Sequence, residues 1–134
     1  MASILDQIVA HKQLEIKRLY EKFDLETLRR TVTPSAKNFY AALSVARVQK
    51  APFFIAEFKR KSPSEGWINR DADVGAQVRS YALAGAGAVS VLTDNHFFGG
   101  SYADLQHAVR TLDERPGEVP LVLQKDFILD PVQI

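Results

Sequence analysis

The stretch FFIAEFKRKSPSEG, residues 53–66, changes from an unbroken apolar run into a dense cluster of charged and turn residues. A short apolar run predicts a buried parallel strand, because both faces of such a strand are covered. This run contains a carboxylate, Glu57, and it leads directly to Lys59. Charges in or beside a buried strand are costly unless they are paired. We therefore expect these two side chains to have a function.

Downstream of this stretch, strand patterns alternate with helix patterns. Strands are expected at residues 52–58, 88–93 and 120–125. A long polar loop to about Asp71 follows the first strand, and Asp73 and Ser101 are typical N-caps of the helices that come next. Gly85 is placed to end the first of these helices, and Asp130-Pro131 opens another. The alternation predicts parallel strands joined by right-handed helical crossovers.

Three helix patterns precede this alternation. Ser3 stands at the start of an amphipathic helix of about five turns, with the spacing of a capping box. Asp24 caps a second, short helix, and a third is expected around residues 38–45. We therefore divide the chain into a helical N-terminal extension, residues 1–48, and a segment of strands and helices, residues 49–134.

Two α/β architectures fit this order of elements, a doubly wound open sheet and part of a TIM (β/α)8 barrel. A complete barrel takes about 250 residues, or roughly 31 for each strand and helix. Residues 52–134 therefore suffice for roughly two and two-thirds such units. Because the chain stops inside a predicted helix, we interpret it as the N-terminal part of a longer barrel, with its first three strands.

Composition excludes several classes of function. The chain has 17 Lys and Arg residues against 16 Asp and Glu residues, so its charge gives no argument for binding nucleic acid or a membrane surface. It contains no cysteine, no apolar run long enough to span a bilayer and no signal-peptide pattern. Its three histidines have no spacing that indicates a shared metal. We expect a cytoplasmic protein without a metal.

Polar residues end each predicted strand, where active sites of such barrels lie. They are Glu57 and Lys59, Thr93 and Asp94, and Lys125 and Asp126. We expect these residues to meet at one rim. Two lysines beside a carboxylate can bind an acidic substrate and donate a proton, because a crowded or desolvated lysine releases its proton more readily.

Three ordered motifs resemble the indole-3-glycerol phosphate synthase family of tryptophan biosynthesis. They are IAEFKRKSPSEG at residues 55–66, VSVLTD at 89–94 with FGGS at 98–101, and LQKDFI at 123–128 with DP and QI in 130–134. The helical segment, with Ser35 and FYAAL at 39–43, also resembles the N-terminal extension of that family. The resemblance covers essentially the whole chain and implies a TIM barrel.

This resemblance implies a lyase that closes the pyrrole ring of 1-(2-carboxyphenylamino)-1-deoxyribulose 5-phosphate, with loss of carbon dioxide and water and without a cofactor. It implies that Lys125 is the general acid, that Lys59 binds the substrate carboxylate and that Glu57 orients both lysines and contacts substrate hydroxyls. Ser62 and Pro63 would lie in a mobile lid loop. Phe98 and Phe127 would form an apolar wall against the aromatic ring, with ordinary core packing as the alternative.

The family also uses a glutamate on strand four as a base and glycine-rich loops after the late strands as a phosphate site, and these lie beyond Ile134. We therefore expect the isolated chain to have little or no synthase activity. An alternative is a non-catalytic partial barrel that self-associates or needs the missing C-terminal part, because its sheet edge and inner face are unpartnered. A weaker alternative is another α/β enzyme that shares only the strand rhythm.

Overall fold

The computed structural model describes residues 2–134 and divides them into two compact units. One unit combines the N-terminal segment through Ser35 with Phe127–Ile134, and the other is Ala36–Asp126. These units group residues by spatial contact, whereas the division at residues 48 and 49 concerns the parts of a barrel and stays a prediction. Within residues 2–134, no helix is both long enough and apolar enough to cross a membrane.

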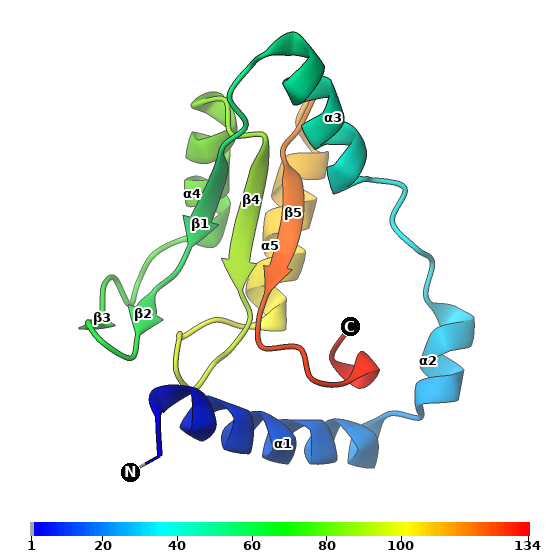
Figure 1. The fold of residues 1–134 in the computed structure, drawn as a ribbon, viewed down its shortest axis with the longest axis vertical. Helices are drawn as coiled ribbons and strands as arrows, with labels where there is room; N and C mark the ends of the chain where they lie inside the picture. Colours follow the sequence, from blue (N-terminus) through cyan, green and yellow to red (C-terminus); the bar gives the residue numbers. More distant parts are fainter. Residues whose placement is uncertain (1) are drawn as a thin grey trace. The chain divides into compact units, whose positions relative to one another are not determined.

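The unit Ala36–Asp126 is built on a parallel sheet. Its strands are β1 (Ile55–Phe58), β4 (Ala88–Leu92) and β5 (Leu121–Lys125), in the order β1-β4-β5. Helices α4 (Val74–Leu83) and α5 (Tyr102–Asp113) connect successive strands and cover the same side of the sheet (Figure 1). This is the predicted alternation of strands and helices, and it makes the unit a mixed α/β structure.

A hydrophobic core fills the space between the sheet and these two helices. Its buried members are Phe58, Val74, Val78, Val89, Val91, Ala108 and Leu112. The central strand β4, which has a neighbouring strand on each side, is buried along its whole length. The first strand differs from our prediction, because Ile55 and Glu57 are exposed while Phe58 is buried. As an edge strand, β1 is covered mainly on its helix side.

Several element boundaries also differ from the predictions. Helix α3 (Phe39–Gln49) runs about a turn longer than expected and ends at Lys50, which adopts the left-handed conformation with φ 53°. The loop after β1 is not wholly irregular, since β2 (Lys61–Ser62) and β3 (Gly66–Trp67) pair as a short antiparallel ribbon. The predicted helix after Asp130 is only a 3₁₀ turn, Pro131–Gln133.

The other unit contains α1 (Ile4–Lys22) and α2 (Leu25–Thr31). The predicted capping box at Ser3 is confirmed, and Asp24 caps α2 as predicted. Within this unit, the Tyr20 hydroxyl donates a hydrogen bond of 2.8 Å to Oδ1 of Asp130. This bond to a carboxylate raises the pKa of the Tyr20 hydroxyl above its ordinary value.

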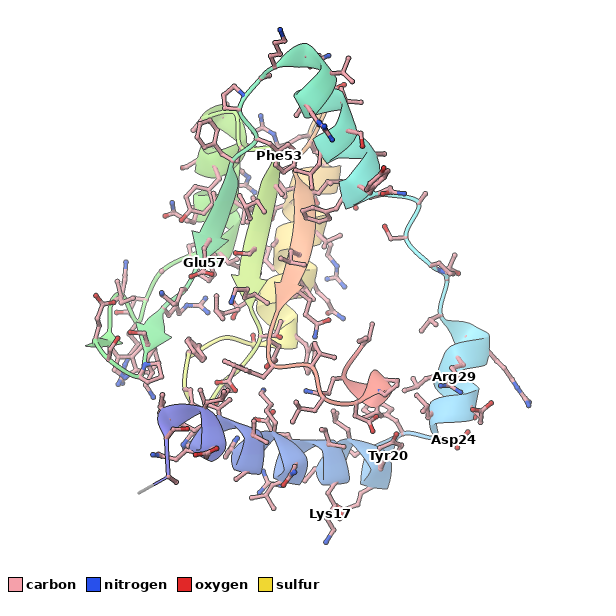
Figure 2. The ribbon with its side chains drawn as sticks, viewed as in Figure 1. Lys17, Tyr20, Asp24, Arg29, Phe53 and Glu57 are labelled. Carbon is pink, nitrogen blue, oxygen red and sulfur yellow. The ribbon has the colours of Figure 1, made fainter. Side chains whose placement is uncertain are left out.

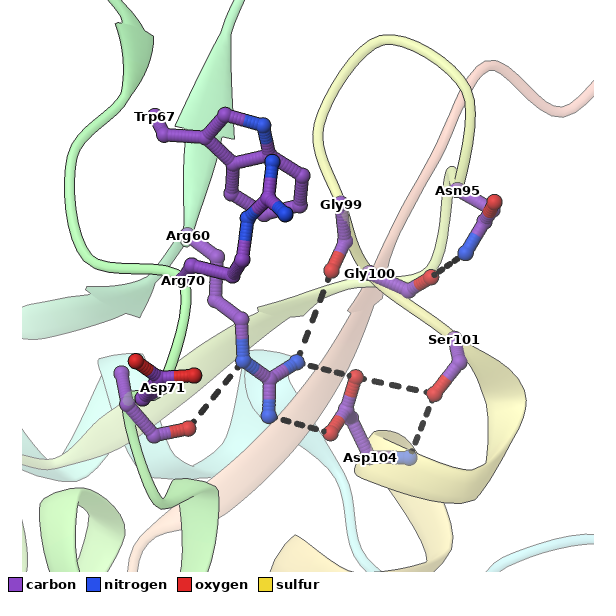
Figure 3. Close-up of a pocket in the computed structure, with 10 residues that line it drawn as sticks. Arg60, Trp67, Arg70, Asp71, Asn95, Gly99, Gly100, Ser101 and Asp104 are labelled. Carbon is purple, nitrogen blue, oxygen red and sulfur yellow. Dashed lines mark hydrogen bonds and ion pairs between the residues drawn. The ribbon is translucent and has the colours of Figure 1, made fainter.

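A charged pair ties the loop after β1 to the start of α5. The guanidinium of Arg60 donates two hydrogen bonds to the Asp104 carboxylate, at 2.6 and 2.9 Å (Figure 3). It also donates to the carbonyls of Ala72 and Gly99, at 3.1 and 3.5 Å. Only 17% of the Arg60 side chain and 12% of the Asp104 side chain are exposed. One arginine therefore links the segments that precede both helices.

Burial by itself raises the pKa of the Asp104 carboxyl, but hydrogen bonds from Arg60 and Ser101 outweigh it and hold the pKa below the ordinary value of 3.8. A carboxyl whose pKa is lowered by folding stabilises the folded state above its unfolded pKa. That stabilisation is lost as the pH falls through the lower, folded pKa. The pair therefore contributes fully at neutral pH and fails in acid.

Replacing Asp104 with alanine should lower the free energy of unfolding by about 2–3 kcal/mol at pH 7, because it leaves the half-buried Arg60 without its partner. Asp113→Ala is the matched control on the same helix, since Asp113 pairs with Lys37 at an exposed site. It should cost less than about 0.5 kcal/mol. Urea titration measures both. An equal loss of unfolding free energy in both variants would contradict the structural role of the Arg60–Asp104 pair. So would a difference in unfolding free energy between the wild type and Asp104→Ala that does not become smaller below about pH 4.

Candidate functional site

The predicted carboxylate, Glu57, lies near the end of β1 (Figure 2). The first predicted lysine, Lys59, is in contact with it. Nζ of Lys59 lies 3.4 Å from Oε1 of Glu57. The second carboxylate oxygen of Glu57 accepts a long hydrogen bond of 3.5 Å from the Ser90 hydroxyl on β4. Both charged side chains stay about one-third exposed. Glu57 is therefore held between a cation and a hydroxyl while it remains open to a ligand.

Strand register places the second lysine on the same face of the sheet as Glu57. Glu57 is aligned with Ser90, and Ser90 is aligned with Leu123. Side chains alternate along a strand, so Lys125, two residues beyond Leu123, returns to that face. Glu57 and Lys125 are two strands apart, which separates them by about 10 Å across the sheet. The shift of two residues from Leu123 to Lys125 adds roughly 7 Å along the strand. A small molecule can bridge that separation.

Lys125 itself is exposed at the end of β5. Its ammonium forms no ion pair with any residue in the described range 2–134. The structure thus brings Glu57 and Lys59 into contact and puts Lys125 on the same face. Lys125 is not drawn into the Glu57–Lys59 pair.

Asp94 does not belong to the predicted polar rim. It is fully buried, and its Oδ1 accepts the backbone N–H groups of Phe97 and Phe98, at 2.7 and 3.1 Å. Its carbonyl accepts the N–H of Gly100 at 2.8 Å. Asp94 therefore shapes the loop after β4, and the prediction that it meets the lysines at the rim is wrong. A side chain that follows a strand can bond its own loop instead, because aspartate readily accepts nearby backbone N–H groups.

Of the predicted lid residues, Ser62 ends β2 and Pro63 begins the turn that leads to β3. Ser62 is buried, and its hydroxyl accepts the backbone N–H of Glu65 at 3.1 Å. Pro63 is exposed at the tip. The loop therefore has hydrogen-bonded structure of its own, and Ser62 has a structural task in it. Its role in contacting a substrate stays a prediction.

The two predicted wall residues are half-buried. Phe98 lies in the loop that Asp94 organises, in the same unit as the strand ends. Phe127 belongs to the other unit and follows directly after Asp126. Their common role against an aromatic ring stays a prediction.

A cavity of about 390 Å³ opens between the loops that follow β1 and β4 (Figure 3). Residues around it include Arg60, Trp67, Arg70, Asn95, Gly100 and Asp104. The Arg70 guanidinium stacks 4.4 Å above the Trp67 ring, and Arg60 is already paired with Asp104. Gly100 leaves no room for a side chain, because a Cβ there would lie 2.0 Å from the Leu92 carbonyl oxygen. These contacts fit a role in holding the loops together.

The structural role of Arg60 was not predicted from the sequence. The spacing of Ser101 and Asp104 predicts a capping box. The structure confirms Ser101 as the N-cap of α5, because its hydroxyl accepts the N–H of Asp104 at 3.1 Å, while the Asp104 carboxylate accepts from Arg60 and from the Ser101 hydroxyl. The partner of that carboxylate lies 44 positions earlier in the chain. Only the neighbouring run of three cations, residues 59–61, could have indicated that one of them is structural.

The chemistry of the strand ends is that of a proton donor and an anion binder. Lysine ammonium groups attract a carboxylate and can donate protons, and Glu57 can orient them or accept hydroxyl groups. Within residues 2–134, no three His, Asp or Glu side chains gather closely enough to hold a metal ion.

Comparison with known proteins identifies the family of the chain. The sequence profile of the indole-3-glycerol phosphate synthase family matches residues 5–134. An indole-3-glycerol phosphate synthase of Bacillus cereus strain B4264 is 46% identical over 135 residues, which cover 100% of this chain and 47% of that relative. Synthases of Bacillus cereus strain AH187 and Bacillus anthracis strain CDC 684 / NRRL 3495 are 45% identical over 134 residues, with the same coverage. The chain spans about half the length of these relatives. It belongs to the indole-3-glycerol phosphate synthase family.

Proposed function

We propose that residues 1–134 are the N-terminal part of an indole-3-glycerol phosphate synthase and supply its proton donor and its site for the substrate carboxylate. The observation that carries this proposal is the placement of Glu57 and Lys125 on one face of a parallel sheet, with Lys59 against Glu57. The sheet order and the helices on one side support this proposal, because they fit the first three strands of a (β/α)8 barrel. The family match supports the same assignment.

The proposed substrate is a small phosphorylated molecule, 1-(2-carboxyphenylamino)-1-deoxyribulose 5-phosphate. Closing its pyrrole ring requires protonation of the carbonyl oxygen and later of the departing hydroxyl, with loss of carbon dioxide and water. Lys125 serves as the general acid, and Lys59 binds the anthranilate carboxylate. Glu57 holds Lys59 through the 3.4 Å pair and contacts substrate hydroxyls. The reaction needs no cofactor, nucleic acid or membrane.

The remaining functions belong to the part of the relatives that this chain does not cover. A base and a phosphate site are still required, and many barrels bind phosphate at loops after their late strands. The open face of the sheet supports the need for that part, since Ile55 is 51% exposed and Leu123 is 38% exposed. Apolar side chains on a sheet face favour a covering layer, so the isolated chain either self-associates or awaits the C-terminal part.

In the full-length synthase, Lys125→Met should lower kcat at least about 100-fold, because it removes the general acid. Lys59→Met should raise KM by about tenfold or more, because it removes the cation that binds the carboxylate. Lys37→Met is the control, since Lys37 pairs with Asp113 on an exposed surface. Steady-state kinetics with indole fluorescence as the readout measures all three. Normal kcat in Lys125→Met would overturn its assignment as the acid.

The purified chain of residues 1–134 should show no turnover above background, because it lacks a base and a phosphate site. Adding a separately produced C-terminal part of the synthase should restore turnover, with a rate that depends on the concentration of the added part. Sizing chromatography of the two species, alone and mixed, shows whether they associate. Turnover by the chain alone, free of full-length enzyme, would contradict the prediction.

A further inference from the structure

Thr93 and Asp126 form a short hydrogen bond directly beyond the ends of two neighbouring strands. The Thr93 hydroxyl follows β4 and donates to Oδ2 of Asp126, which follows β5, at 2.7 Å. Thr93 is 5% exposed. Hydroxyl-to-carboxylate bonds of this length are charge-assisted and stronger than neutral ones. The bond therefore fixes the two strand ends against each other at a buried position.

Thr93 also restrains the backbone of Lys125, the residue that precedes Asp126. The N–H of Thr93 donates to the carbonyl of Lys125 at 3.1 Å, which extends the ladder one step beyond the pair of Leu92 and Lys125. The Thr93 side chain then holds the residue that follows Lys125. One threonine thus restrains Lys125 through its carbonyl and through its neighbour.

Thr93 is itself held firmly. The next residue, Asp94, is fully buried and accepts three backbone N–H groups of its own loop. Because side chains alternate in extended chain, Thr93 and Asp126 point away from the face that carries Lys125. The hydrogen-bonded pair of Thr93 and Asp126, which we call the clamp, therefore lies on the opposite face of the sheet and leaves the Lys125 ammonium open toward a ligand.

We propose that Thr93 and Asp126 are positioning residues that aim the Lys125 side chain at the substrate. This inference rests on the proposed function, in which Lys125 is the general acid. Proton donation depends steeply on the placement of the donor, and small displacements of a catalytic group produce large losses in rate. We expect the clamp to affect the rate of the chemical step and not substrate binding, because it lies on the face opposite to Lys125 and the Glu57–Lys59 pair.

The test uses the full-length synthase with Thr93→Val, which keeps the shape of the side chain and removes the hydroxyl. We expect kcat to fall about tenfold while KM changes less than about twofold. Thr93→Ser, which keeps a hydroxyl, should recover most of that loss. Asp126→Ala should lower kcat similarly, and the double variant should be no slower than either single variant, since both remove the same bond.

Three outcomes separate this inference from the proposed function. Normal kcat in Lys125→Met would overturn the role of the acid, and with it this inference. An inactive Lys125→Met with normal kcat in Thr93→Val would overturn the positioning role alone, as would losses that simply multiply in the double variant. If near-UV circular dichroism shows that Thr93→Val is misfolded, Asp126→Asn replaces it, because it keeps an acceptor and weakens the bond. A several-fold lower kcat then supports the inference, and an unchanged kcat overturns it.

Discussion

The arrangement of the strand-end loops depends on the ion pair between Arg60 and Asp104. Its two hydrogen bonds join Arg60, two residues beyond the end of β1, to the first turn of α5. Further bonds from Arg60 reach the carbonyls of Ala72 and Gly99. Each of these loops has hydrogen bonds of its own, around Ser62 and around Asp94, and the Arg60–Asp104 pair adds a mostly buried link between them. The pair therefore cross-links the two loops beside the ends of β1 and β4 (Figure 3).

The Arg60–Asp104 pair also shows that neighbouring cations can have different roles, some in holding the structure and one in the proposed site. Residues 59–61 are three consecutive cations, and two of them are committed to the protein itself. Arg60 is paired with Asp104, while Lys61 donates to the carbonyl of His96 at 2.8 Å. Lys59 contacts Glu57 and stays about one-third exposed. An arginine suits the buried bidentate contact, because its planar fork matches a carboxylate, whereas a lysine suits proton transfer.

Local signals made much of the fold predictable. Ser3, Asp24, Asp73 and Ser101 cap helices where their side chains reach N–H groups within the next turn, and the apolar runs mark the three parallel strands. Long-range contacts were not predictable in this way. The partner of Arg60 is distant in sequence, and the exposure of β1 depends on what covers its second face. Among the proposed site residues, the sequence alone identified both lysines and Glu57, but gave no sign that Asp94 serves its own loop.

The exposed face of β1 can contact both a ligand and a covering part of the protein. Ile55 and Glu57 lie on this same face, two positions apart, so the strand presents an apolar side chain and a carboxylate to whatever covers the sheet. A covering half that packed against Ile55 and Leu123 would desolvate the neighbouring Glu57–Lys59 pair. Charges in such an enclosed site interact more strongly than they do in water. In the proposed synthase, the covering half would therefore complete the hydrophobic core and strengthen the charge interactions of the site at the same time. Catalysis would then depend on the assembly of the two halves.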